Sequence, residues 1–167
     1  LLASPDHNGL GQGLLLLSGW YESRDKAKSD AYLQRAAEAN SAGALRILAL
    51  RLRQQQGSRP PTAEAIAWLE KAANGGDAMA MRYLAWQSYM QGQARRAEDW
   101  VAPAAMQGDV EALFFLANLW SSDAKGMSGD ATRAAAVYEA LQDVANEGPR
   151  ARRMLAMLAL QGKGMAK

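Results

Sequence analysis

The sequence repeats itself with a period of about 32 residues. Positions 68–84 contain an aromatic residue, an alanine pair, a Gly-Asp turn and a leucine, and positions 100–116 repeat that order. Each matched pair is 32 residues apart, as in Trp68 and Trp100, or Asp77 and Asp109. A period between about 20 and 50 residues is typical of repeat arrays, in which each unit buries its apolar face only by stacking on its neighbours. An extended array of small units is therefore the expected fold.

Five segments share the spacing of one helix face: a small residue, a leucine four positions later and, in every case, a small residue directly after the leucine. These leucines, called the reference leucines below, are Leu17, Leu48, Leu84, Leu116 and Leu155. The spacing places the small residues and the leucine on one side of an α-helix, where a second helix can approach closely. It predicts helices over residues 10–23, 42–56, 78–91, 110–122 and 150–160.

A second set of helices is predicted between the first, over residues 27–39, 62–74, 94–107 and 130–147. Each is marked by an aromatic residue ahead of an alanine pair or alanine: Tyr32, Trp68, Trp100 and Tyr138, the last only if two residues are inserted. We expect these aromatic residues in the core between paired helices. Glycine followed by aspartate, as in Gly76-Asp77, suits the end of one helix and the cap of the next. No stretch alternates as a strand would.

The predicted fold class is all-α. The helices form about four to five antiparallel pairs that stack into an α-solenoid, and residues 1–167 form a single repeat domain. The last predicted helix has no second helix after it, so we expect the chain either to be part of a longer array or to have a C-terminal edge that another element completes. The longest purely apolar run, Leu14 to Leu17, is too short to cross a bilayer. Its helix is apolar on nearly all sides, so we expect it either buried under a further repeat or exposed as a contact patch.

The composition argues against catalysis. The chain has no cysteine, which excludes disulfides and thiolate chemistry, and its one histidine, His7, has no further metal ligands at usable spacing. The glycines at 9, 11 and 13 do not follow a strand, so they do not form a nucleotide loop. A net charge of +2 does not favour nucleic acid. We expect no enzyme activity, no cofactor and no metal.

The repeats resemble the Sel-1-like repeat family, a relative of the tetratricopeptide repeat. The resemblance rests on Ala80, Leu84 and Ala85, and on the runs Ala65-Trp68-Ala72-Ala73-Gly76 and Ala97-Trp100-Ala104-Ala105-Gly108. The closing residues 161–165 are similar to the family's Gly-x-Gly loop. Alanine or serine replaces the family's glycine after the reference leucine. The resemblance covers most of the chain and implies a right-handed superhelix.

The resemblance also implies a function. Members of this family are mostly non-catalytic scaffolds that bind another protein, either a peptide segment or a subunit of an assembly. Many are exported in bacteria and act in the cell envelope, including in exopolysaccharide secretion. A periplasmic or secreted bacterial location is therefore expected, with a cytoplasmic one left open.

The helices that carry the reference leucines are called the first helices, and those between them the second helices. One face of the first helices is the candidate binding surface. Positions two before, two after and five after each reference leucine lie opposite the packing face, on the side that lines the concave groove in tetratricopeptide-like arrays. These positions mix arginine with aromatic residues and methionine, types enriched at interaction surfaces. The candidates are Arg46, Leu50, Arg53, Arg82, Trp86, Tyr89, Phe114, Asn118, Arg153 and Met157.

Two interpretations of this surface stay open. Trp86 and Phe114 either contact a partner protein or pack between helices as core. Arg46, Arg82 and Arg153 share one repeat position, so they either form a basic stripe for an acidic peptide or an anionic polysaccharide, or are simply solvated.

Overall fold

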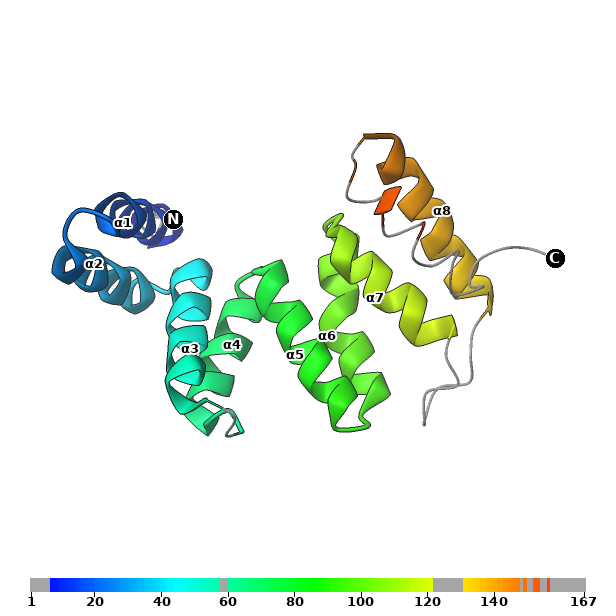
Figure 1. Ribbon diagram of the computed structural model, residues 1–167, viewed down its shortest axis with the longest axis horizontal. Coiled ribbons are helices and arrows are strands. Elements are labelled where there is room, and N and C mark those ends of the chain that lie inside the picture. The colour runs from blue at the N-terminus through cyan, green and yellow to red at the C-terminus, as the bar shows by residue number, and fades with distance from the viewer. Residues whose placement is uncertain are drawn as a thin grey trace, which may run out of the picture. The chain divides into compact units, whose positions relative to one another are not determined.

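The computed structural model describes residues 7–57, 60–121 and 131–147, with single positions at 149, 152, 153 and 156. These ranges are helical apart from short turns, and they contain no strand (Figure 1). The helices are α1 (His7–Tyr21), α2 (Lys26–Glu38), α3 (Ala42–Gln56), α4 (Ala63–Asn74), α5 (Ala78–Met90), α6 (Ala94–Met106), α7 (Val110–Ser121) and α8 (Ala131–Glu147). The predicted all-α fold and the alternation of first and second helices are confirmed. The predicted helix over 150–160 falls mostly outside the described residues, although positions 152, 153 and 156 are helical.

The chain divides into two compact units, residues 1–80 and 81–167, with the boundary inside α5. In the first unit α1 packs on α2 and α3 packs on α4, and Figure 1 shows each pair running side by side. In the second unit α7 packs on both α6 and α8. The single domain expected over residues 1–167 stays a prediction.

The turns that join one helix pair to the next have the same backbone hydrogen bonds in three places. The amide groups of Ser41, Asp77 and Asp109 donate to carbonyl groups five residues earlier, at distances of 2.9, 3.1 and 3.1 Å. The residue before each of them has positive φ: Asn40, Gly76 and Gly108. Glycine adopts this conformation without a steric penalty, and asparagine tolerates it best among other residues. This geometry is a Schellman-type helix end, as the Gly-Asp pairs predicted.

The core is built from small residues with one leucine among them. On the first helices the alanines on either side of the reference leucine are fully buried: Ala44, Ala49, Ala80, Ala85, Ala112 and Ala117 are each 0% exposed. Leu84 and Leu116, which lie between such alanines, are 3% exposed. Because an alanine extends only one carbon from the backbone, neighbouring helix axes come close and the methyl groups fill the space between them. The predicted packing face is confirmed in α5 and α7.

The second helices bury a different residue from the one predicted. Leu33, Leu69 and Val101 are 1%, 1% and 0% exposed, whereas the aromatic residue directly before each of them is only half-buried. The prediction that Tyr32, Trp68 and Trp100 form the core between paired helices was therefore wrong in this respect. A helix turns about 100° per residue, so the smaller aliphatic residue faces the partner helix and the ring lies at the edge of the core. Tyr32 stacks there on Tyr21, with ring centroids 5.5 Å apart.

The buried aliphatic residue also gives the correct repeat alignment of α8, the last helix of the second set. Leu33, Leu69 and Val101 each precede an alanine by four residues, and Leu141, which is 0% exposed, precedes Ala145 by the same interval. Helix α8 therefore fits the repeat without the two inserted residues that alignment on Tyr138 required. The side chain of Tyr138 lies outside the described residues.

The core assignment predicts how two substitutions differ. Leu69→Ala is expected to lower the free energy of unfolding by about 2–5 kcal/mol, because it leaves a cavity between α3 and α4. Met106→Ala, at a side chain that is 88% exposed, is expected to change it by less than about 0.5 kcal/mol. Urea unfolding followed by circular dichroism measures both values. Similar values for the two variants would contradict the assignment of Leu69 to the core.

Candidate protein-interaction surface

Two arginines of the candidate surface are paired with aspartates of the next helix pair. Arg46 of α3 donates from Nε to Oδ2 of Asp77 at 3.0 Å. In the second unit Arg82 of α5 occupies the equivalent position, and its Nε lies 3.1 Å from Oδ1 of Asp109. A second nitrogen of Arg82, Nη1, lies 3.5 Å from Glu111. An ion pair thus joins the same repeat positions in both units, but only Nε of Arg46 makes a hydrogen bond, because the buried Nε of Arg82 has no hydrogen-bond partner.

Each of these aspartates also caps a helix. Oδ1 of Asp77 accepts the backbone N–H of Ala80, and Oδ1 of Asp109 accepts that of Ala112, both at 2.8 Å. One carboxylate therefore satisfies an N–H group at the start of a first helix and holds the arginine of the preceding first helix. We call each Arg–Asp pair with its cap a clasp. Negative charge near a helix N-terminus is also favoured by the helix dipole.

Two of the three arginines in the basic stripe that the sequence suggested, Arg46 and Arg82, are already paired in the clasps. The side chains of Arg46 and Arg82 are only 22% and 24% exposed, and their partner carboxylates only 13% and 18%. A guanidinium already matched to a carboxylate presents little net charge to an external anion, because the field of the pair falls off quickly with distance. The third arginine of the stripe, Arg153, is exposed. The sequence did not reveal the clasps because their partners lie 31 and 27 residues away.

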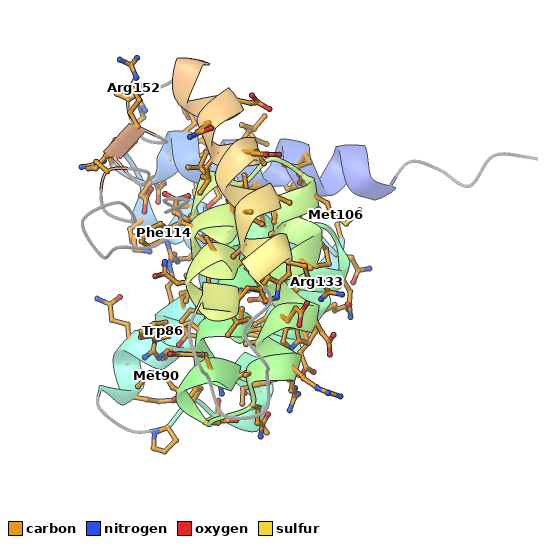
Figure 2. All side chains as sticks on the ribbon, turned by 90° about the vertical axis from the view of Figure 1, so that its right-hand side faces the viewer. Trp86, Met90, Met106, Phe114, Arg133 and Arg152 are labelled. Carbon is orange, nitrogen blue, oxygen red and sulfur yellow. The ribbon has the colours of Figure 1, made fainter. Side chains whose placement is uncertain are left out.

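Two of the three aromatic members of the candidate surface, Trp86 and Tyr89, lie on α5 in the second unit. Trp86, Tyr89 and Met90 follow the i, i+3, i+4 spacing of one helix side and are 55%, 38% and 66% exposed. Trp86 and Met90 are labelled in Figure 2. The ring of Tyr89 lies 6.2 Å from Trp86 and meets Phe115 of α7 edge-on at 5.9 Å, measured between ring centroids. We call Trp86, Tyr89, Met90 and Phe115 the aromatic surface.

The structure answers part of the question left open for the two aromatic candidates. Trp86 exposes more than half of its surface, so it is not a core residue, whereas Phe114 is half-buried. Asn118 is also half-buried and donates from Nδ2 to the carbonyl oxygen of Phe114 at 2.8 Å. Met90 and Phe115 were missed because they lie one position outside the repeat positions that were considered.

The remaining candidates lie elsewhere. In the first unit Leu50 is half-buried and Arg53 is exposed, beside the clasp of Arg46 in α3. Met157 lies outside the described residues. The structure thus brings Arg82, Trp86 and Tyr89 together on α5, with Phe114 and Asn118 on α7 in the same unit. Whether these residues bind a partner stays a prediction.

Neither a metal centre nor a membrane span is found in the described part of the chain. No group of three or more histidine, cysteine, aspartate or glutamate side chains there could hold an ion. None of the described helices is both long enough and apolar enough to cross a bilayer.

The fold can be compared with known proteins. No protein-family model matches the sequence, and no curated protein matches it either. Among solved structures, the crystal structure of a Sel1 repeat protein from Oxalobacter formigenes is similar, with a TM-score of 0.71 and 22% sequence identity. The match covers 99% of this chain and 68% of that one. This chain has the Sel1-repeat fold. The predicted resemblance is thereby confirmed at the level of the fold, with about a third of the neighbour's chain beyond the match.

The strength of the Arg46–Asp77 clasp in this Sel1-type fold can be measured. A double-mutant cycle over Arg46→Ala and Asp77→Ala is expected to give a coupling energy of about 1 kcal/mol, because the pair is largely buried. Asp77→Ala alone is expected to cost about 1–2 kcal/mol, since it also removes a cap.

The pair of Arg51 and Asp30 is the matched control for this cycle. It also joins two helices, at 2.7 Å, but its aspartate is 49% exposed. Its coupling energy should be smaller, within about 0.2–1 kcal/mol, and should fall more steeply with added salt. Equal coupling energies and equal salt dependence would contradict the distinction between clasp and surface pair.

Proposed function

We propose that this protein is a non-catalytic scaffold that binds a segment of another protein on the aromatic surface of α5 and α7. The observation that carries the proposal is the exposure of Trp86, Tyr89 and Met90 on one side of a single helix. Solvent-facing positions of a helix are usually polar, and aromatic residues and methionine are enriched where proteins contact one another. Half-buried Phe115 supports Tyr89 from the neighbouring helix, so the surface is held in place before a partner arrives.

The chemistry of the surface favours an apolar partner segment. The nearest arginine of the candidate set, Arg82, is held by Asp109 and Glu111. The free energy of binding would then come from the burial of aromatic rings and a thioether. This contribution does not depend on charge. This argues against the alternative of an anionic polysaccharide, because a polyanion needs unpaired cationic groups along its path. The absence of cysteine and the single histidine support a binding role over a catalytic one.

The proposed setting is a bacterial envelope assembly in the periplasm or outside the cell. The support for this setting is the resemblance of the repeats to exported scaffolds. It is tested together with the binding surface, by capturing partners separately from envelope and cytosolic extracts of a bacterium.

The test of the surface compares three variants with the parent. A Trp86→Ala/Met90→Ala variant removes the exposed apolar area without touching the clasp, whereas an Arg82 substitution would also loosen the contact between α5 and α7. Met106→Ala is the matched control, since Met106 is exposed on α6 in the same unit (Figure 2). Tyr89→Ala gives a third, milder change. Circular dichroism first establishes that all variants are equally helical.

A partner identified by mass spectrometry is then purified and titrated in a calorimeter. We expect the dissociation constant to rise at least tenfold for Trp86→Ala/Met90→Ala and to stay unchanged for Met106→Ala, because truncation of central aromatic residues is costly and truncation of an isolated one is not. Raising the salt concentration from about 0.05 to 0.5 M should change binding by less than about threefold. Unchanged binding by the double variant would exclude the aromatic surface, and a steep loss with salt would favour an electrostatic contact.

A further inference from the structure

A chain of aromatic contacts joins the end of α1 to α2 in the first unit. Trp20 and Tyr21, the last two residues of α1, meet edge to face, with ring centroids 4.8 Å apart. Tyr21 also stacks on Tyr32 of α2, and Nζ of Lys28 lies over the Tyr21 ring, 5.4 Å from its centroid. Trp20 is 54% exposed and the two tyrosines are half-buried. The three rings thus form one cluster, part of which faces solvent.

Two arginines at the edges of this cluster lie over rings rather than beside carboxylates. Cζ of Arg24 is 4.4 Å from the centroid of the Trp20 ring, and Cζ of Arg35 is 5.8 Å from that of Tyr32. Both side chains are exposed, and within the described residues neither forms an ion pair, not even with Glu38, one turn after Arg35. A ring attracts a cation but has no net charge, so each guanidinium keeps its full positive charge. The arginines of the clasps differ, because a carboxylate balances each of them.

The other acidic side chains around the two arginines are paired with different cations. Asp25 accepts the backbone N–H of Lys28 at 3.1 Å and pairs with its Nζ atom at 3.3 Å. Asp30 and Glu22 both pair with Arg51, at 2.7 and 3.9 Å. The cations that remain available to an external anion are therefore the two arginines that lie over rings.

We propose that Arg24 and Arg35 bind an acidic peptide segment of a partner protein, which lies along α2 with a carboxylate at each guanidinium. The N–H groups of a guanidinium point outward from its edge, so a ring against its face leaves them able to donate to a carboxylate. Arg24 precedes the N-cap of α2, and Arg35 lies in the last turn. Helix α2 has 13 residues and is about 20 Å long. An extended segment of about six residues spans that length.

The distribution of charge favours a peptide over a uniformly charged polymer. Residues 20–38 contain four basic and four acidic side chains, so a nucleic acid or a polyuronate would meet repulsion as well as attraction along its path. A peptide can place carboxylates only where the arginines lie. The rings also offer a sugar or a base little to stack on, because Tyr21 and Tyr32 cover each other and Arg24 lies over Trp20.

An NMR titration of the ¹⁵N-labelled full chain tests the proposal. The probe is a ten-residue Gly-Ser peptide with a pair of glutamates near each end, and its control has glutamines instead. The amide signals of residues 20–35 and the Nε signals of Arg24 and Arg35 should shift with the glutamate peptide only. The dissociation constant should lie in the millimolar range, because contacts between exposed charges are weak, and it should rise as salt is raised from about 0.05 to 0.5 M.

Single-residue variants test which cations bind the peptide. Arg24→Gln and Arg35→Gln should each raise the dissociation constant at least about threefold, since each removes one charge-assisted contact. Lys26→Gln is the matched control, because it removes the same charge from an exposed side chain of α2 that pairs with Asp30 and lies over no ring. It should change the constant by less than about twofold. Circular dichroism first establishes that the variants are equally helical.

Three results would overturn the proposal: no shift within residues 20–35, equal shifts with the glutamine peptide, or an equal loss of binding with Lys26→Gln. Polygalacturonate at the same carboxylate concentration gives a further comparison. Tighter binding of this polymer than of the peptide would overturn the choice of a peptide and assign the site to an anionic polysaccharide. The probe has no apolar side chain, so its failure to bind would leave the function proposed for the aromatic surface unaffected.

Discussion

The structure depends on the close contact of alanine-lined helix faces. Helices α3, α5 and α7 place alanines on both sides of their reference leucines, and these alanines are inaccessible to solvent. Close approach gains dispersion energy over the whole length of the helices and leaves little room for a larger side chain. Because such faces are flat and narrow, one helix pair cannot bury them alone. Stacking of pairs follows directly, and so does an uncovered face wherever the stacking stops.

The clasps illustrate how a repeat array divides its polar groups between stability and binding. Asp77 and Asp109 each accept an N–H group of the helix that they cap and form an ion pair with an arginine from the preceding first helix. A buried arginine without such a partner would cost several kcal/mol, whereas a paired one is close to neutral. Arg46 and Arg82 therefore link consecutive helix pairs, and the exposed residues of α5 beside Arg82, which are Trp86, Tyr89 and Met90, are aromatic or apolar.

The comparison with the Sel1 repeat protein supports the architecture but does not identify a binding partner. At 22% identity the similarity concerns the path of the backbone. The identity of a binding partner is determined by exposed side chains such as Trp86 and Met90, which a shared fold does not specify. The function proposed above thus rests on exposure, spacing and charge pairing in this chain.

The sequence alone determined the all-α repeat fold, the bounds of α2 to α8 to within one residue and the Gly-Asp turns, because these follow from local spacing. A small residue four positions before a leucine, or glycine before aspartate, has the same consequence wherever it occurs. The exposure of Leu10, Leu16 and Trp20 and the pairing of Arg46 with Asp77 were decided only in the tertiary structure. Both depend on which helix lies opposite, which is a contact between residues far apart in the chain. The same reason explains why Trp68 was predicted in the core while the structure buries Leu69: periodicity gives the side of a helix, but packing against a neighbour selects the residue at its centre.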